Sequence, residues 1–199
     1  MSYKVAFITS QGGTHPMHRR FAESVNADFQ FVDHKIRWQD INAPAWKRYL
    51  SWVVSAWTFP NIKKYDFFLS GGQHFMPVFM RVLGKLSKNQ KLVCFHDNET
   101  LYFMKMGKYP KQTIWALKKL LPKYDAHIVT SNMTRNLLRS YLGEDAKIYQ
   151  VFNGVEKNRL NQLLQITPNL STKNLVFIGN IYAGWRSWYK GIDLMINVF

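Results

Sequence analysis

Short apolar runs alternate with longer amphipathic segments along most of the chain. The short runs have the length and composition of strands in a sheet that is covered on both faces. The longer segments carry apolar residues at helical spacing. Because each parallel pairing needs a crossover that is usually a helix, this alternation predicts an α/β fold with a doubly wound parallel sheet. The predicted strands are Lys4–Thr9, Phe29–Val32, Asp66–Leu69, Lys91–Phe95, His127–Thr130 and Ile148–Phe152, and the predicted helices are His15–Val25, Ala45–Trp57, Phe75–Leu86, Thr113–Leu121, Met133–Tyr141 and Glu156–Gln165.

The alternation changes after the sixth strand, which sets the expected domain organisation. Residues 1–165 hold all six strands, and we expect them to form one N-terminal domain. Residues 166–173, with one proline and several small polar residues, are typical of a linker. Residues 174–199 contain one new strand, Asn174–Ile178, and the start of a helix at Lys190. Because a single strand and helix cannot bury their own apolar faces, we expect these residues to begin a second domain that is truncated at the end of the 199-residue chain.

Composition and charge narrow the function classes. Hydrophobic residues make up 47% and aromatic residues 16% of the chain, which excludes a disordered or low-complexity protein. Lysine and arginine number 27 against 12 acidic residues, so the formal net charge is +15. The charge favours an anionic partner such as a phosphate group, a phospholipid surface or nucleic acid, unless the lysines line a solvated helix face. Between Glu99 and Asp125 the chain has no acidic residue but contains Lys105, Lys108, Lys111, Lys118, Lys119 and Lys123.

The sequence carries no pattern that indicates export or a membrane span. The lone cysteine, Cys94, cannot form an internal disulfide, which fits a reducing compartment. The N-terminus enters a short apolar stretch without a small-residue cleavage site, so it is typical of a first strand rather than of a signal peptide. The most apolar window, Trp46–Phe59, contains two cations and is shorter than the roughly 20 residues that a spanning helix needs. We therefore expect a cytoplasmic protein.

The carboxyl ends of the predicted strands carry the candidate chemistry, because ligands of an open parallel sheet bind at that edge. The first and third strands are each followed by a glycine pair, Gly12–Gly13 and Gly71–Gly72. Such a pair before a helix is either a plain tight turn or a loop whose N–H groups receive a phosphate or a sugar oxygen. The fourth strand ends in a dense group of side chains able to transfer protons and form hydrogen bonds, namely His96, Asp97, Asn98, Glu99 and Thr100.

His96 is the main candidate in this group, although a histidine held by a neighbouring main-chain group would give the same pattern. The segment Asp97–Glu99 has the spacing of an acidic pair that holds a divalent ion. A hard cation needs several converging oxygens, however, and the nearby lysines can neutralise phosphate without a metal. No spacing typical of zinc ligands occurs. We therefore expect no metal ion.

Five segments of the chain together resemble one enzyme family. They are KVAFITSQGG, YDAHIVTSNMTRNLL, IYQVFNGVE, LVFIGNIY and YKGIDLMINVF, in this order along essentially the whole chain. The sequence is similar to the retaining GT-B glycosyltransferases of the large group 1 family, which transfer a sugar from a nucleotide sugar to an acceptor held between two Rossmann-like domains. The resemblance implies that the chain is the acceptor-side domain and the start of the donor domain. It implies no cofactor, because the nucleotide-diphosphate sugar is the donor substrate.

The resemblance also implies roles for residues at the carboxyl edge of the sheet. Gly12 and Gly13 match the glycine loop that faces the donor diphosphate, where the backbone must approach closely. His96 matches the histidine that contacts the transferred sugar and stabilises developing charge, and it is the expected catalytic residue. Asn153 and Gly154 match a donor-binding segment near the interdomain cleft, where a structural turn is the alternative. The residues expected on the acceptor side are Gly72, Asp97 and Asn98.

Two cations near the C-terminus are expected to hold the departing diphosphate. Lys190 matches the family's lysine, and Arg186 lies near enough in sequence to act as its arginine partner. They would stabilise the negative charge that grows on the leaving group. The chain departs from the family pattern at Gly179–Asn180, where the family usually has Gly-Arg, so Arg186 also fits an exposed loop residue. The implied reaction retains the anomeric configuration and needs no metal, and we expect the isolated 199-residue chain not to turn over.

The segment Ala45–Trp57 gives information about the kind of acceptor. Its apolar residues follow roughly helical spacing beside Lys47 and Arg48. One interpretation is packing into the core. The other is an interfacial surface that rests on an anionic bilayer together with the lysines after the fourth strand, which predicts a peripheral enzyme on the inner face of the membrane and a glycan or lipid-linked acceptor. The apolar residues are Trp46, Tyr49, Leu50, Val53, Ala56 and Trp57.

Two other function classes stay open. A non-catalytic basic module that holds an anionic polymer or a membrane surface would also explain the charge. The sequence shows no recognisable nucleic-acid motif, so we expect no nucleic acid partner. A non-hydrolysing sugar-nucleotide epimerase shares the two-domain architecture, but the NGV and KGIDL segments favour the transferase.

Overall fold

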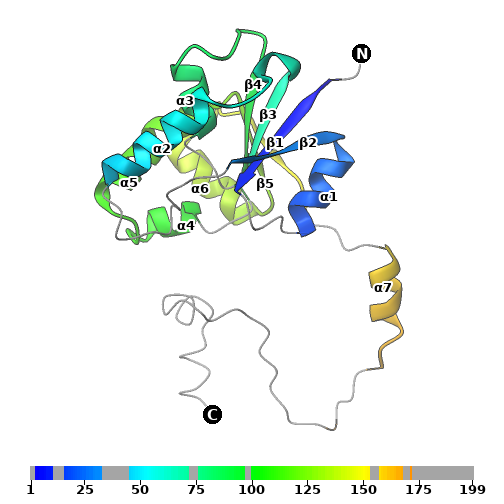
Figure 1. The fold of residues 1–199 in the computed structure, drawn as a ribbon. Helices are drawn as coiled ribbons and strands as arrows, with labels where there is room; N and C mark the ends of the chain where they lie inside the picture. Colours follow the sequence, from blue (N-terminus) through cyan, green and yellow to red (C-terminus); the bar gives the residue numbers. More distant parts are fainter. Residues whose placement is uncertain are drawn as a thin grey trace. The chain divides into compact units, whose positions relative to one another are not determined.

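The computed structural model contains the parallel sheet that the sequence predicts, and it describes residues 3–10, 16–32, 45–71, 76–96, 100–152, 157–167 and 171. Six strands form one all-parallel sheet in the order β2-β1-β3-β4-β5-β6 (Figure 1). The strands are β1 (Val5–Ser10), β2 (Ala27–Val32), β3 (Phe67–Gly71), β4 (Lys91–His96), β5 (Ala126–Val129) and β6 (Ile148–Gln150). The helices are α1 (Pro16–Ser24), α2 (Ala45–Trp57), α3 (Met76–Val82), α4 (Thr100–Lys105), α5 (Lys111–Leu120), α6 (Asn132–Leu142) and α7 (Lys157–Leu164), with 3₁₀-helices η1 (Ile62–Lys64) and η2 (Leu121–Lys123).

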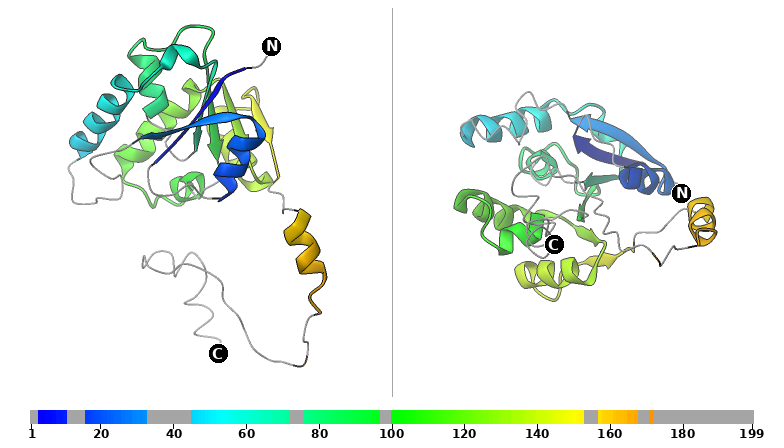
Figure 2. Two further views of the ribbon diagram at one scale, coloured as in Figure 1. Left: turned by 45° about the vertical axis from the view of Figure 1, so that its right-hand side comes forward. Right: turned by 90° about the horizontal axis from the view of Figure 1, so that it is seen from below.

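The order of the strands decides which helices cover which face. The chain passes from β1 outward to β2 and then returns beyond β1 to β3, so the strand order reverses at β1. Because crossovers between parallel strands are right-handed, this reversal places α1 on one face of the sheet and α2, α3 and α5 on the other (Figures 1 and 2). The carboxyl ends of β1 and β3 are therefore the switch point at which an open α/β sheet binds its ligand.

Alternate positions of the strands fill the core on the two sides of the sheet. Phe7 and Phe95 pack on the α1 side. Ile8 and Phe68 pack on the opposite side with residues of α2 and α3. Because the central strands are buried on both faces, their sequences are continuous apolar runs rather than alternating ones.

Most boundaries lie within a few residues of the predicted ones, and α2 begins and ends as predicted. Helix α3 is shorter than the predicted helix Phe75–Leu86, because the backbone turns left-handed at Gly84, whose φ is +68°. The amide of Lys85 then donates to the carbonyl of Met80 at 2.9 Å, which closes the helix end. Helix α4 was not predicted, since its six residues make less than two turns and show no period.

Helix α6 begins at a side-chain N-cap. Ser131 has an extended backbone, and its Oγ accepts a hydrogen bond from the amide of Thr134 at 3.1 Å. At the other end, the amide of Gly143 donates to the carbonyl of Arg139 at 2.8 Å, and φ at Gly143 is +89°. Local chemistry in the sequence therefore fixes both ends of α6.

By its internal contacts the chain divides into two compact units, Met1–Gly154 and Val155–Phe199, and α7 belongs to the second. The predicted strand Asn174–Ile178 and the helix predicted to start at Lys190 lie outside the described residues, as does most of the predicted linker 166–173. The second domain therefore stays a prediction. Among the described helices, none combines the length and the apolar content that crossing a bilayer requires.

Candidate functional site

The carboxyl edge of the sheet brings together the ends of three neighbouring strands. β1 ends at Ser10, β3 at Gly71 and β4 at His96, and β3 lies between β1 and β4. Of the residues predicted for the site, His96 is the one within the described part of the chain. The predicted site residues outside the described ranges are Gly12, Gly13, Gly72, Asp97, Asn98, Asn153, Gly154, Arg186 and Lys190.

His96 is paired with a second histidine from the neighbouring strand. Its Nε2 lies 3.0 Å from Nδ1 of His127 in β5, and the two rings stack with centroids 5.3 Å apart. Both residues are buried, with 1% and 2% of their surface exposed. One of the two nitrogens must donate and the other accept, so the proton position on His127 determines which nitrogen of His96 carries hydrogen.

Polar groups from three strands and one loop surround this histidine pair on the same face of the sheet. Cys94 lies opposite His127 in the parallel register, and Ser70 lies opposite Cys94. The hydroxyl of Tyr124 is 3.3 Å from Oγ of Ser70, and its ring centroid is 5.8 Å from that of His127. Burial raises the pKa of the Tyr124 hydroxyl well above its usual range, so this group is neutral at physiological pH. We call Ser70, Cys94, His96, Tyr124 and His127 the buried polar cluster.

Sequence reasoning found one member of the cluster and missed His127. The period of two along β4 places Cys94 and His96 on one face, and that much follows from sequence. Which residue of β5 lies beside them depends on the register, because Cys94 pairs with His127 and His96 with Val129. A histidine inside a short buried strand was the available signal, since a buried polar group needs a partner.

Three side chains of the buried polar cluster are of types that can bind a metal ion. Ligand atoms of Cys94, His96 and His127 all lie within 4.8 Å of one another, and sulfur and imidazole nitrogen are the donors that zinc prefers. The 3.0 Å contact between the two rings engages one nitrogen of each in a hydrogen bond, however. A hydrogen-bonded pair explains this arrangement without an ion, and the absence of a metal stays a prediction.

Gly71, the first residue of the second glycine pair, is in close contact with the side chains around it. A Cβ added to Gly71 would lie 3.0 Å from Cζ of Phe7 and 3.5 Å from Cε1 of His18. The ring of His18, in α1, in turn lies with its centroid 5.5 Å from that of Phe7 and 6.0 Å from that of Phe95. An alanine at position 71 would therefore require the ring of Phe7 to shift by a few tenths of an ångström, whereas its contact with His18 would be an ordinary van der Waals contact.

Comparison with known families identifies the domain. A family model described as Glycosyltransferase Family 4 matches residues 1–159. The chain belongs to glycosyltransferase family 4. The family predicted from the sequence is thereby confirmed, and the six-stranded all-parallel sheet is the Rossmann-like fold of an N-terminal GT-B domain. Membership implies a nucleotide-sugar glycosyltransferase with a donor and an acceptor. Comparison with curated proteins gives no match.

Proposed function

We propose that this glycosyltransferase family 4 chain transfers a sugar from a nucleotide-diphosphate sugar to a glycan or lipid-linked acceptor, with retention of anomeric configuration and without a metal. The family match over residues 1–159 is the observation that carries the proposal. The switch point at the ends of β1 and β3, one strand from His96, supports it because that edge is where an open α/β sheet holds a ligand.

In this proposal each site residue has one task. The backbone amides at Gly12 and Gly13 and the cations of Lys190 and Arg186 bind the diphosphate, whose charge grows as it leaves. The imidazole of His96 contacts the sugar. Retention means that the acceptor oxygen bonds to the anomeric carbon on the face from which the diphosphate departs. Gly72, Asp97 and Asn98 are proposed to contribute to the acceptor side of the site. Asn153 and Gly154 are proposed to contribute to the donor side.

The burial of His96 adds a requirement. With 1% of its surface exposed, the ring has no free access to a ligand in the described state. Donor binding must therefore uncover the ring of His96. Until then, the hydrogen bond to His127 keeps the orientation and the proton position of the His96 ring defined. The proposal thus predicts a conformational step between donor binding and transfer.

The acceptor is proposed to be presented at an anionic membrane. Helices α2, α3, α4 and α5 contain no acidic residue, which supports a peripheral location on the inner face of the membrane. The basic residues of these four helices are Lys47, Arg48, Arg81, Lys105, Lys111, Lys118 and Lys119.

The test uses the product of the complete reading frame and a panel of nucleotide-diphosphate sugars labelled in the sugar. Each donor is incubated with soluble glycans or with a lipid extract, in the presence and absence of a chelator. We expect one donor to give labelled product at equal rates with and without the chelator, with the donor's anomeric configuration kept in the product. No transfer from any donor, together with saturable binding of an acidic polymer, would replace the proposal with a non-catalytic basic module.

A further inference from the structure

Helix α2 has an apolar face that points away from the core. Trp52 and Ala56 are buried in the core, and Tyr49 and Val53 are half-buried. Of the six apolar residues named from the sequence, Trp46, Leu50 and Trp57 are exposed, so packing into the core describes only part of this segment. The exposed residues recur at intervals of four, four and three, which places them on one side of the helix. This outer stripe consists of Trp46, Leu50, Val54 and Trp57, each between 50% and 62% exposed.

Two lysines lie against the tryptophans at the ends of the outer stripe. Nζ of Lys85, which follows α3, is 4.1 Å from the ring centroid of Trp57. Nζ of Lys47 is 5.6 Å from the ring centroid of Trp46. Each pair combines an aromatic ring with a cation that stays at the surface, so the stripe is apolar along its length and positive at both ends.

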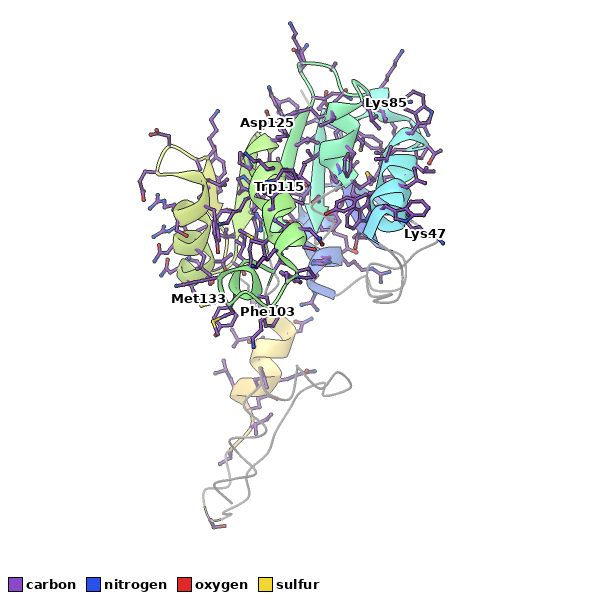
Figure 3. The ribbon with its side chains drawn as sticks, turned by 90° about the vertical axis from the view of Figure 1, so that its left-hand side faces the viewer. Lys47, Lys85, Phe103, Trp115, Asp125 and Met133 are labelled. Atoms are coloured by element: carbon purple, nitrogen blue, oxygen red, sulfur yellow. The ribbon has the colours of Figure 1, made fainter. Side chains whose placement is uncertain are left out.

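The basic character extends over the neighbouring helices. Figure 3 shows the side of the molecule on which Lys47, Lys85 and Trp115 lie. Trp115 of α5 is 65% exposed, and α5 carries Lys111, Lys118 and Lys119 without an acidic residue. The helices on this side thus present tryptophan and lysine together and offer no carboxylate to repel an anion.

We propose that the outer stripe of α2 inserts into the headgroup region of an anionic lipid bilayer, with Lys47 and Lys85 on lipid phosphates. This inference rests on the proposed function, because it names the surface that brings the domain to a lipid-linked acceptor. Tryptophan at the boundary, aliphatic side chains between and lysine at the rim are the composition of an interfacial helix. A second copy is a poorer occupant, since a symmetric contact through this face would bring lysines of both copies together.

The experiment measures co-sedimentation of the full 199-residue chain with vesicles. One preparation is phosphatidylcholine alone, and in the other about one third of the lipid is phosphatidylglycerol. The stripe variant replaces Trp46, Leu50, Val54 and Trp57 with glutamine, and its matched control replaces the exposed Tyr3 and Tyr149 with glutamine. The charge variant, Lys47→Gln with Lys85→Gln, is compared with Lys91→Gln and Lys147→Gln, which remove the same charge elsewhere.

We expect the unchanged chain to bind anionic vesicles and to lose binding as salt rises. The stripe variant should bind at least tenfold more weakly, which corresponds to about 1.4 kcal/mol, and the charge variant several-fold more weakly. Both controls should bind as the unchanged chain does. Circular dichroism of each variant checks the fold. The altered side chains are exposed, except that of Lys85, which is half-buried.

Three outcomes would overturn the docking surface: equal binding to both vesicle types, undiminished binding of the stripe variant, or no vesicle binding together with a dimer that the stripe variant dissociates. Vesicle binding that depends on the stripe, without sugar transfer by the complete gene product, would leave the docking surface standing and remove the transferase proposal. Transfer to a soluble acceptor without vesicle binding would support the transferase proposal and remove the docking surface. The two proposals therefore fail separately.

Discussion

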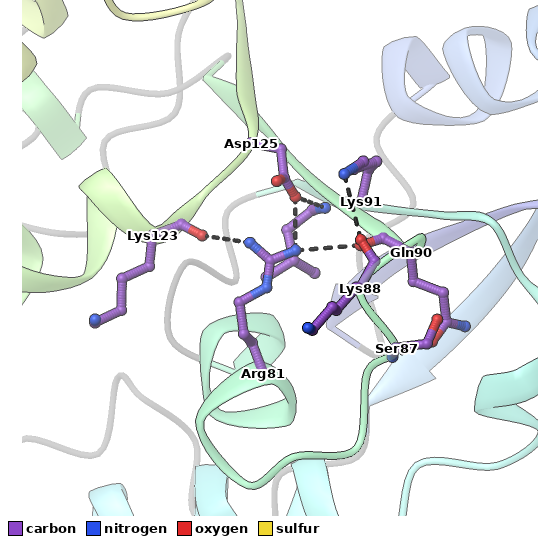
Figure 4. A network of polar contacts seen from close by, with 8 residues as sticks. Arg81, Ser87, Lys88, Gln90, Lys91, Lys123 and Asp125 are labelled. Carbon is purple, nitrogen blue, oxygen red and sulfur yellow. Dashed lines mark hydrogen bonds and ion pairs between the residues drawn. The ribbon is translucent and has the colours of Figure 1, made fainter.

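The two ends of β4 and β5 differ in how their polar groups are satisfied. At the amino ends, a charged network ties α3 to the chain segments that enter both strands (Figure 4). At the carboxyl side, the polar groups are a pair of stacked histidines on one face of the sheet and the neutral hydroxyl of Tyr124. Tyr124 itself precedes β5, but its hydroxyl reaches Ser70 near the carboxyl end of β3. The contrast indicates that one end stabilises the fold, while the other holds side chains in place for chemistry.

Arg81 is the centre of the amino-end network. Its guanidinium donates to the carbonyl of Lys123 at 2.9 Å, to the carbonyl of Gln90 at 3.2 Å and to Oδ2 of Asp125 at 2.6 Å. The same oxygen of Asp125 accepts from the amide of Leu92 at 2.7 Å. Each of these partners is a main-chain group or an opposite charge, which fits a structural role.

The carboxyl side has fewer connections between elements. His96 is bound to His127, one strand away, and Tyr124 is close to Ser70, two strands away. These contacts set the orientation and proton positions of side chains rather than joining helices to the sheet. Changes at this end should therefore affect transfer more than stability, and changes at the amino end should do the opposite.

The largest expected effect is on catalysis. His96→Gln keeps a side chain that can hydrogen-bond to His127 but removes the imidazole, so we expect transfer by the complete gene product to fall about 100-fold or more. The free energy of unfolding should change by less than about 1 kcal/mol, as measured by urea denaturation. A variant that stays folded and transfers at the normal rate would remove His96 from the proposed site.

The second largest effect is expected from a variant that breaks the amino-end network. Arg81→Leu removes the donor for three acceptors and leaves the Asp125 carboxylate without its cation, so we expect a loss of about 2 kcal/mol in the free energy of unfolding. The matched control is Arg139→Leu, because Arg139 pairs at 3.4 Å with the 80% exposed Glu144 and should cost about 0.5 kcal/mol or less. Equal losses in the two variants would show that the network has no special stabilising role.

The smallest effect depends on pH. Burial alone would raise the pKa of Asp125, but hydrogen bonds from Arg81 and from the Leu92 amide outweigh it and hold the pKa below its usual 3.8. A lowered pKa in the folded state means that the carboxylate stabilises the protein above the unfolded pKa and loses this effect as pH falls through the folded pKa. Asp125→Asn should therefore cost about 1 kcal/mol at neutral pH, a figure that allows for solvent screening of this partly exposed pair.

Urea denaturation between neutral pH and pH 3 measures this dependence. The difference between the unchanged chain and Asp125→Asn should begin to shrink near the unfolded pKa of about 3.9 and fall further below it. A difference that stays constant down to pH 3 would contradict the lowered pKa.

The fold was predictable because each element carries its own pattern. The residues of α2 show a helical period over 13 residues, and Ser131 supplies a cap, so both helices could be placed from local sequence. The end of α3 was misplaced, since apolar residues continue to Leu86 while the backbone turns at Gly84. Hydrophobic periodicity reports burial, and it does not report where a left-handed residue ends a helix.

The candidate site was less predictable, because it depends on register and on which face of a helix is covered. The pairing of Cys94 with His127 is a property of the whole sheet, and no local pattern reveals it. Likewise, Leu50 and Ala56 both belong to the apolar residues of α2, yet one is exposed and the other buried. Helical spacing alone does not tell a buried face from an outer stripe when both are apolar.

The most direct test of the account is hydrogen exchange of the complete gene product with and without the donor that it uses. The account predicts that donor binding changes exchange at the carboxyl ends of the strands, around Gly71 and His96, and leaves Arg81, Lys91 and Asp125 unchanged. Donor-dependent changes confined to the amino-end network, or the same change at both ends, would contradict the division of the sheet into a structural end and a functional end.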